Sequence, residues 1–224
     1  MRFSIQQILE KLEASPVVPL FFHADAAYAQ SLLDACYAGG LRAFEFTNRG
    51  ANAAATFAQL SKHVAANLPD LALGIGTIYR PEEAEQFLDL GADFIIQPII
   101  TPAVGEVCHR HNVAWMPGAM TPNEVYQAES LGAAVVKIFP GDAVGPGYIK
   151  ALRGPMPKVK LMVTGGVQPN ETNLREWFGA GVNYVGIGSQ LIKKAEELGI
   201  AGFTDHIAEL VQIVKNIRGK REHV

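Results

Sequence analysis

The chain alternates short apolar runs, rich in β-branched and aromatic residues, with longer stretches in which polar and apolar positions are mixed. The starts of the apolar runs lie about 20 to 28 residues apart, which leaves room for one helix after each run. The pattern therefore predicts eight successive strand–helix units. The predicted strands are 17–22, 43–46, 71–76, 94–98, 114–117, 135–139, 160–164 and 184–188.

Helix start and stop signals fall between these runs. Thr101-Pro102 and Thr121-Pro122 each place a capping hydroxyl before a proline at the first helical position, and Glu124 completes a capping box with Thr121. The N-terminus predicts one further helix, because Ser4 and Gln7 form a capping box. The apolar face of this helix would consist of Ile5, Ile8, Leu9 and Leu12. Left-handed helix ends are expected at Gly39-Gly40, Gly91, Gly132 and Gly181.

Repeated strand–helix units imply parallel strands, because each helix returns the chain to the same edge of the sheet. Eight units in a chain of this length are typical of a closed (β/α)8 TIM barrel, here with an extra N-terminal helix. A doubly wound open sheet is the alternative, but no Gly-x-Gly-x-x-Gly follows the first predicted strand. No linker divides the chain, so residues 1–224 are predicted to form one domain.

Composition excludes several classes of protein. Lys plus Arg number 19 and Asp plus Glu 22, so the net charge of −3 does not suggest binding to nucleic acid or to a membrane surface. No apolar run is long enough to span a membrane, and the N-terminus does not resemble a signal peptide. Cys36 and Cys108 fit no metal-ligand spacing and are expected to be apolar core residues. A cytoplasmic protein is the expectation.

Two charged residues interrupt predicted strands. Lys137 lies within Val-Val-Lys-Ile-Phe, on a strand that a barrel buries on both faces. Burial disfavours the ammonium form, and a neutral amine is the form that attacks a carbonyl to make a Schiff base. Strand alternation turns Glu45 into the barrel, toward Lys137, where a carboxylate can relay protons to an imine. The alternative is that the two form a buried ion pair with no catalytic role.

Other polar residues follow the predicted strands at the end where barrels hold their active sites. Arg49 follows the second strand, and its guanidinium could bind a substrate carboxylate, although a surface role is also open. Thr77 and Gln97 follow the third and fourth strands, and His23 follows the first. His109-x-His111 faces two directions and does not predict a metal site, so we expect no metal and no cofactor.

Glycines follow the last two predicted strands. Thr164-Gly165-Gly166 ends the seventh strand, and Gly188-Ser189 ends the eighth. Backbone amides that glycines expose at adjacent strand ends and helix N-termini bind phosphate in many barrels. The alternative is a pair of tight turns that bind nothing.

These motifs together resemble the 2-keto-3-deoxy-6-phosphogluconate (KDPG) and 4-hydroxy-2-oxoglutarate (KHG) aldolase family, whose members are Schiff-base aldolases. The resemblance extends from about Ile8 to about Ile192 and rests on six motifs in order. They are Phe-Glu-Phe-Thr-Asn-Arg (44–49), Gly-Ile-Gly-Thr (74–77), Met-Pro-Gly (116–118), Val-Lys-Ile-Phe-Pro (136–140), Val-Thr-Gly-Gly-Val (163–167) and Gly-Ile-Gly-Ser (186–189).

The resemblance implies a role for each matched residue. Lys137 corresponds to the imine lysine and Glu45 to the general acid–base. Arg49 and Thr77 correspond to groups around the pyruvate carboxylate, and Phe139 and Pro98 line that pocket. The region of the distal phosphate corresponds to Thr164, Gly165, Gly166, Gly188 and Ser189. The resemblance also implies a homotrimer.

The sequence departs from the family at two places. The fourth strand ends in Gln97-Pro98-Ile99 where Ser-Pro-Gly is common, and Phe22-His23 stands where many members have a basic residue. We expect a class I aldolase that cleaves KDPG, a phosphorylated 2-keto acid, to pyruvate and glyceraldehyde 3-phosphate. Related alternatives are cleavage of 4-hydroxy-2-oxoglutarate or of 2-dehydro-3-deoxy-6-phosphogalactonate. Alternatives of another kind are an isomerase or synthase with Glu45 as base, and a non-enzymatic sugar-phosphate sensor.

Overall fold

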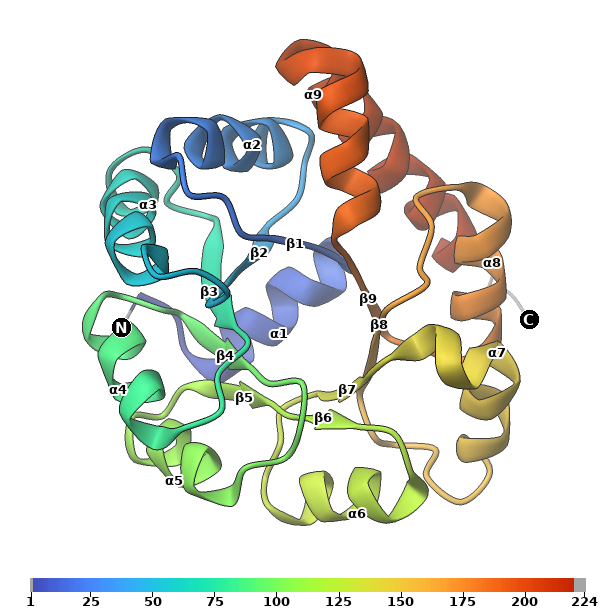
Figure 1. The fold of residues 1–224 in the computed structure, drawn as a ribbon. Coiled ribbons are helices and arrows are strands. Elements are labelled where there is room, and N and C mark those ends of the chain that lie inside the picture. Colours follow the sequence, from blue (N-terminus) through green and yellow to red (C-terminus); the bar gives the residue numbers. More distant parts are fainter. Residues whose placement is uncertain (1, 220–224) are drawn as a thin grey trace.

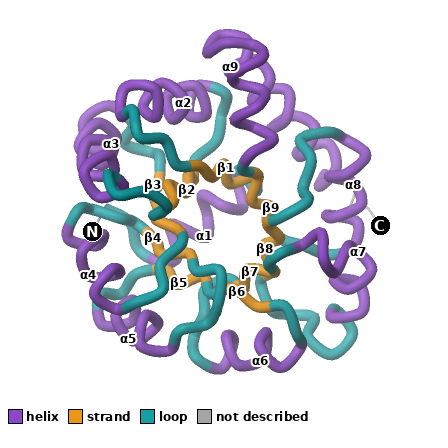
Figure 2. Tube along the Cα trace, viewed as in Figure 1, coloured by secondary structure: helices purple, strands orange, loops and turns teal. Residues whose placement is uncertain are grey.

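The computed structural model describes residues 2–219, which form a ring of parallel strands surrounded by helices (Figures 1 and 2). The strands are β1 (Val17–Phe21), β2 (Ala43–Thr47), β3 (Ala72–Gly76), β4 (Phe94–Ile96), β5 (Ala114–Met116), β6 (Gly118–Ala119), β7 (Val136–Ile138), β8 (Leu161–Thr164) and β9 (Tyr184–Ile187). The helices are α1 (Ile5–Ala14), α2 (Ala26–Ala38), α3 (Ala53–Asn67), α4 (Pro81–Asp89), α5 (Pro102–Arg110), α6 (Pro122–Ser130), α7 (Gly141–Leu152), α8 (Glu171–Ala180) and α9 (Ser189–Gly219). The predicted barrel with an additional N-terminal helix is confirmed.

The fifth predicted strand is divided into two, and the seam of the nearly closed ring lies between its two parts. The strand order is β5-β4-β3-β2-β1-β9-β8-β7-β6, so the two outer strands are consecutive in the chain. Pro117 separates them, and proline lacks the N–H that a continuous ladder needs. β5 pairs with β4 and β6 pairs with β7. The carbonyl of Pro117 accepts a 2.8 Å hydrogen bond from the Lys137 N–H, which ties the break to β7.

Strand alternation separates two apolar cores. Side chains such as Phe44 and Phe46 pack between the strands and the surrounding helices. A smaller core fills the lower part of the barrel, where Ile8 and Leu12 of α1 join inward-facing strand residues. Figure 1 shows α1 behind the ring, so the view is onto the carboxyl ends of the strands. Because α1 and this inner core fill one end, the opposite end is the one open to a substrate.

Most of the predicted helix caps and helix ends are present in the structure. Ser4 and Gln7 form the capping box of α1, and Thr121 and Glu124 form that of α6. Thr101 caps α5 by its position but makes no side-chain capping bond. Gly40, Gly91, Gly132 and Gly181 have the positive φ values expected at helix ends.

Cys36 and Cys108 are buried, free thiols, and burial raises the pKa of Cys108 to about 12. Within residues 2–219, every helix is too short or too polar to cross a bilayer.

Candidate active site

Lys137 and Glu45 meet across the mouth of the barrel. They lie on β7 and β2, which are not neighbours in the ring. The Lys137 Nζ atom is 3.6 Å from Glu45 Oε1, and the two side chains are 6% and 1% exposed. The same Nζ lies 5.4 Å from the centre of the Phe139 ring, at a distance that favours a cation–π contact. The structure thus brings together an amine and a carboxylate that sequence alternation placed on one side of their strands.

The space around Glu45 depends on a glycine. A Cβ atom at Gly76 on the adjacent strand β3 would overlap the Glu45 carboxyl group. Any larger residue at position 76 would therefore displace the carboxylate from Lys137. A second glycine, Gly186 on β9, leaves room in the same way for the Thr164 hydroxyl.

Three buried oxygens at the mouth have no hydrogen-bond partner among the described residues: Glu45 Oε2, Thr47 Oγ1 and Thr164 Oγ1. A buried polar atom without a partner costs free energy, so such atoms are rare unless a ligand or water completes them. Glu45 is paired with Lys137 and Thr164 lines the adjoining cavity, so these free acceptors mark the place where a polar ligand would bind. Thr47 was not among the predicted site residues, although the alternation that points Glu45 inward applies to it as well.

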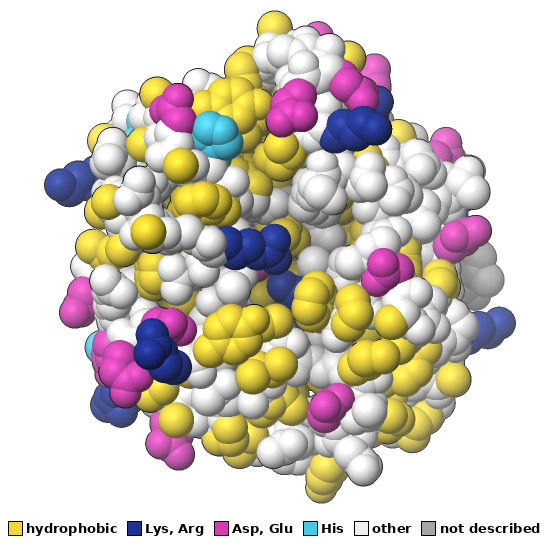
Figure 3. Space-filling view, viewed as in Figure 1, with side chains coloured by type: hydrophobic (Ala, Val, Ile, Leu, Met, Phe, Trp, Pro, Cys, Tyr) yellow, Lys and Arg dark blue, Asp and Glu magenta, His cyan; other side chains and the backbone are white. Residues whose placement is uncertain are grey.

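A cavity of about 200 Å³ lies beside this pair. Its lining brings together all five residues predicted to hold the distal phosphate and two, Arg49 and Phe139, predicted to lie around the pyruvate part of the substrate. The five are Thr164, Gly165, Gly166, Gly188 and Ser189. A wider groove of about 690 Å³ adjoins the cavity, since Arg49 and Ser189 line both. Figure 3 shows Lys and Arg atoms gathered around a hollow at the centre of this face.

The backbone around the cavity is suited to an anion. Gly165 and Gly166 have φ values of +96° and +73°, so consecutive residues adopt conformations that only glycine takes easily. Consecutive turns of this kind direct backbone N–H groups into a concave anion site. Ser189 is the first residue of α9, whose N-terminus carries a partial positive charge.

Thr77 and Pro98 lie on the same rim, on the β3 and β4 sides of the pair. Thr77 directly follows Gly76, which adjoins the Glu45 carboxylate. The Pro98 carbonyl packs against Gly118, and Gly118 is paired with Lys137 in the ladder. Neither residue lines the 200 Å³ cavity. The rim therefore has two parts, one around Lys137 that includes Thr77 and Pro98, and a distal one around Gly165, Gly166 and Gly188.

Two polar residues near the strand ends face elsewhere. Gln97 is fully buried, and its amide bonds to the Ile78 carbonyl and the Trp115 indole rather than to the barrel interior. His23 accepts a hydrogen bond from the Asp25 N–H and packs on Tyr28, with ring centres 4.7 Å apart. Neither side chain lines the cavity or the groove.

His109 and His111 have partners other than a metal. The His111 Nε2 atom is 2.7 Å from Glu85, and His109 packs against the edge of Trp115. Across residues 2–219, no group of three His, Cys, Asp or Glu side chains is arranged to hold a metal ion.

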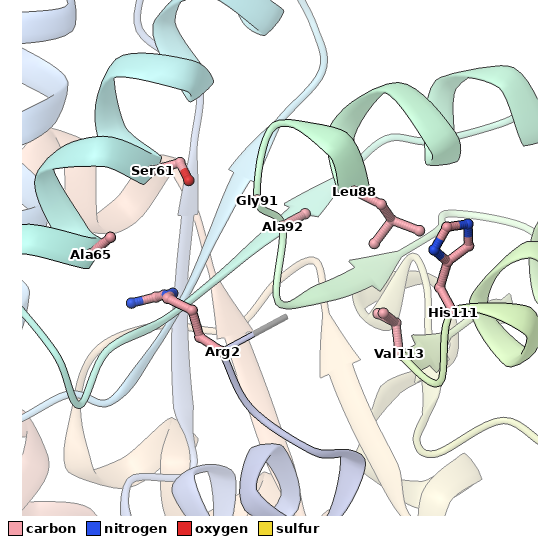
Figure 4. A pocket seen from close by; sticks show the side chains of 8 residues that line it. All are labelled: Arg2, Ser61, Ala65, Leu88, Gly91, Ala92, His111 and Val113. Atoms are coloured by element: carbon pink, nitrogen blue, oxygen red, sulfur yellow. The ribbon is translucent and has the colours of Figure 1, made fainter.

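A further cavity, of about 300 Å³, lies at the opposite end of the barrel (Figure 4). Gly91 and Ala92, which precede β4, and Val113, which precedes β5, line it together with Arg2 and His111. It contains none of the predicted site residues. The predicted site residues lie instead toward the carboxyl ends of the strands, where barrels of this type hold their active sites.

Comparison with known proteins identifies the family. A family model described as KDPG and KHG aldolase matches residues 8–201. The chain belongs to the KDPG and KHG aldolase family. The 2-dehydro-3-deoxy-phosphogluconate aldolase of Haemophilus influenzae is 34% identical over 168 residues, which cover 75% of this chain and 77% of the relative.

Two further members of the family show its range. The 2-dehydro-3-deoxy-6-phosphogalactonate aldolase of Escherichia coli is 34% identical over 127 residues, which cover 56% of this chain and 61% of that protein. The structure of the KDPG aldolase of Legionella pneumophila, with pyruvate captured as a covalent carbinolamine, superposes with a TM-score of 0.79 at 26% identity. That match covers 89% of this chain and 96% of the other. Membership indicates a carbon–carbon lyase.

Proposed function

We propose that this family member cleaves KDPG to pyruvate and glyceraldehyde 3-phosphate through a Schiff base on Lys137. The observation that carries the proposal is the buried Lys137–Glu45 pair, whose second carboxylate oxygen has no partner among the described residues. An ion pair that served only stability would be expected to have its remaining acceptor satisfied. Here one oxygen is left free for a substrate hydroxyl or a water.

Imine formation uses both residues of the pair. Lys137 first transfers a proton to Glu45, and the resulting neutral amine adds to the C2 ketone and gives a carbinolamine. Glu45 donates a proton to the carbinolamine hydroxyl, which leaves as water, and the nitrogen lone pair forms the protonated imine. Glu45 is then a carboxylate again, ready for the next proton transfer.

Cleavage of the carbon–carbon bond follows. Glu45, directly or through a water, takes the proton of the C4 hydroxyl, and the C4–O bond becomes a carbonyl. The electron pair of the C3–C4 bond moves to the protonated imine, which becomes an enamine, and glyceraldehyde 3-phosphate leaves. Protonation at C3 and hydrolysis of the imine then release pyruvate and free Lys137. The imine is the electron sink throughout, so the mechanism needs no metal.

The rest of the rim would hold the two ends of the substrate. We assign the carboxylate end to Thr77 and Arg49 and the methylene part to Phe139 and Pro98. The distal phosphate would lie in the 200 Å³ cavity, against the Gly165-Gly166 turn and the N-terminus of α9. This cavity favours a phosphorylated substrate over 4-hydroxy-2-oxoglutarate, which ends in a carboxylate on C4 and carries no phosphate.

Reduction with borohydride in the presence of pyruvate tests the proposal. The expected result is an irreversible adduct of pyruvate on the peptide that contains Lys137, with loss of activity. An isomerase, a synthase or a sugar-phosphate sensor with Lys137 as a fixed charge would form no adduct. Absence of the adduct, or an adduct on another lysine, would overturn the assignment.

We also propose that the protein works as a homotrimer in the cytoplasm. An apolar set on one side of the rim supports self-association, since its members are 41–64% exposed. They are Tyr79, Ile99, Met120 and Tyr126, which follow β3, β4 and β6 or lie on α6. Light scattering should give the trimer mass, and Ile99→Asp should shift it toward the monomer.

A further inference from the structure

Thr77 has an unusual backbone for its residue type. Its φ of +62° lies in the left-handed region, which β-branched residues rarely adopt. Among the described residues the other non-glycine with a positive φ is Asn112, and asparagine tolerates this conformation far better. A strained residue of this kind persists only where its surroundings hold it in place.

The left-handed turn breaks the alternation of β3. Leu73 and Ile75 lie in the helix-facing core, and a regular strand would put Thr77 there next. Instead Ile78 occupies that core and is fully buried, while Thr77 is half-buried. The turn therefore releases the Thr77 side chain from the helix-facing core, directly after Gly76, which adjoins the Glu45 carboxylate.

Hydrogen bonds from the two neighbouring loops hold this turn. On the β2 side, the Asn48 N–H donates to the Gly76 carbonyl at 2.9 Å. On the β4 side, the Gln97 amide N–H donates to the Ile78 carbonyl, also at 2.9 Å. The carbonyls of the residues on either side of Thr77, Gly76 and Ile78, are thus both held by hydrogen bonds.

Gln97 is itself held from behind. Its amide oxygen accepts a 2.7 Å hydrogen bond from the Trp115 indole N–H, and both side chains are buried, at 0% and 1% exposure. Ile96 faces the inner core, so its neighbour Gln97 faces the helices. Gln97 therefore reaches the site only through the backbone of the Thr77 turn.

We propose that Gln97 is a positioning residue, which holds the Ile78 carbonyl and so keeps Thr77 in the left-handed conformation that binds the carboxylate end of pyruvate. This rests on the proposed function, because it assigns Thr77 to the substrate carboxylate. Loss of the Gln97 bond should weaken binding of the keto acid and leave the chemistry of Lys137 and Glu45, on other strands, nearly unchanged.

The test measures borohydride trapping of pyruvate as a function of pyruvate concentration. Gln97→Met removes the hydrogen bonds while keeping the length of the side chain. We expect the half-saturating pyruvate concentration to rise about tenfold, as for loss of one hydrogen bond, with the saturating rate within about threefold of the parent. Gln127→Met, the same exchange at an exposed position of α6, should change neither value.

A double-mutant cycle separates positioning from general loss of structure. In a Thr77→Gly background the left-handed turn no longer needs support, because glycine adopts it without strain. Adding Gln97→Met to Thr77→Gly should then raise the half-saturating concentration by less than about twofold. Trp115→Phe, which keeps an aromatic ring but removes the indole N–H, gives a second variant and should also raise it.

The outcomes are distinct. A folded Gln97→Met enzyme with the parent's pyruvate dependence would overturn the positioning role, and so would an equal effect of Gln97→Met in both backgrounds. If Gln97→Met does not fold, an unchanged pyruvate dependence in Trp115→Phe would overturn it instead. Absence of any adduct in the parent would overturn the proposed function, whatever the variants do.

Discussion

The two ends of the barrel hold their buried polar groups in different ways. At the mouth, Glu45, Thr47 and Thr164 each present an oxygen without a partner among the described residues. At the opposite end, which α1 fills and which we call the floor, Asp93 accepts hydrogen bonds from the Leu73 N–H and the Arg2 guanidinium. One floor atom, Arg2 Nη1, is also without a partner, but the other terminal nitrogen of the same guanidinium is bound.

The same contrast holds for the carboxylates that bridge elements. Glu13, at the floor, accepts hydrogen bonds from Tyr184 and Arg218, each at 2.6 Å, and joins α1 to β9 and α9. Glu45, at the mouth, is more deeply buried, and its one ion pair among the described residues is with Lys137. The floor therefore uses its polar groups for stability, and the mouth keeps acceptors free at a cost to stability.

The largest expected effect comes from removing the amine at the mouth. Lys137→Ala should reduce cleavage below detection while the barrel stays folded, because alanine removes the amine and leaves the backbone ladder of β7 in place. Lys160→Ala, a lysine before β8 at the floor, should retain activity. Turnover assays and thermal unfolding of both variants check this, and substantial activity in Lys137→Ala would contradict the imine mechanism.

The next effect concerns the free carboxylate oxygen. Glu45→Gln keeps the size of the side chain but removes the proton relay, so cleavage should slow by about 10²–10⁴-fold. Exchange of pyruvate methyl protons in deuterium oxide should slow with it. Exchange at the parent's rate would mean that another group serves the enamine step.

The sequence was sufficient to predict where the mouth lies and which side chains point into it, but not the local backbone geometry around it. Eight strand–helix units and the inward direction of Glu45 and Lys137 follow from periodicity, which depends on few residues at a time. The break at Pro117 and the left-handed turn at Thr77 depend on contacts with neighbouring strands, which short-range sequence patterns do not contain. Gln97 was expected at the strand end, but its attachment to Trp115 depends on a partner 18 residues away.

A smaller effect is expected at the distal part of the rim. Binding of phosphate by several amides and a hydroxyl contributes about 2–4 kcal/mol, so KDPG should exceed 4-hydroxy-2-oxoglutarate in kcat/KM by roughly 30- to 700-fold. The absence of a basic residue at Phe22-His23 favours the lower end. Ser189→Asp should abolish the difference by charge repulsion, and equal kcat/KM values in the parent would refute the phosphate assignment.

The smallest effect tests the floor. Glu13→Gln weakens the bonds to Arg218 and Tyr184, so we expect the free energy of unfolding to fall by about 1 kcal/mol, or about 2–4 °C in Tm. The kcat/KM should not change, because the floor does not contact the substrate. Glu10→Gln, at an exposed position of the same helix, is the control and should leave Tm nearly unaltered.

The difference in Tm between the parent and Glu13→Gln should depend on pH in a definite direction. Partial burial opposes ionisation of Glu13, but the hydrogen bonds from Arg218 and Tyr184 outweigh it and lower the pKa below the ordinary 4.5. A carboxyl group with a lowered pKa stabilises the fold above its unfolded-state pKa, and this contribution is lost as the pH falls through the folded-state value. The Tm gap between parent and Glu13→Gln should therefore be full at pH 7 and narrow below pH 4.5. A gap that stayed constant into acid, or a loss of kcat/KM in Glu13→Gln, would show that the two ends of the barrel are not separated in this way.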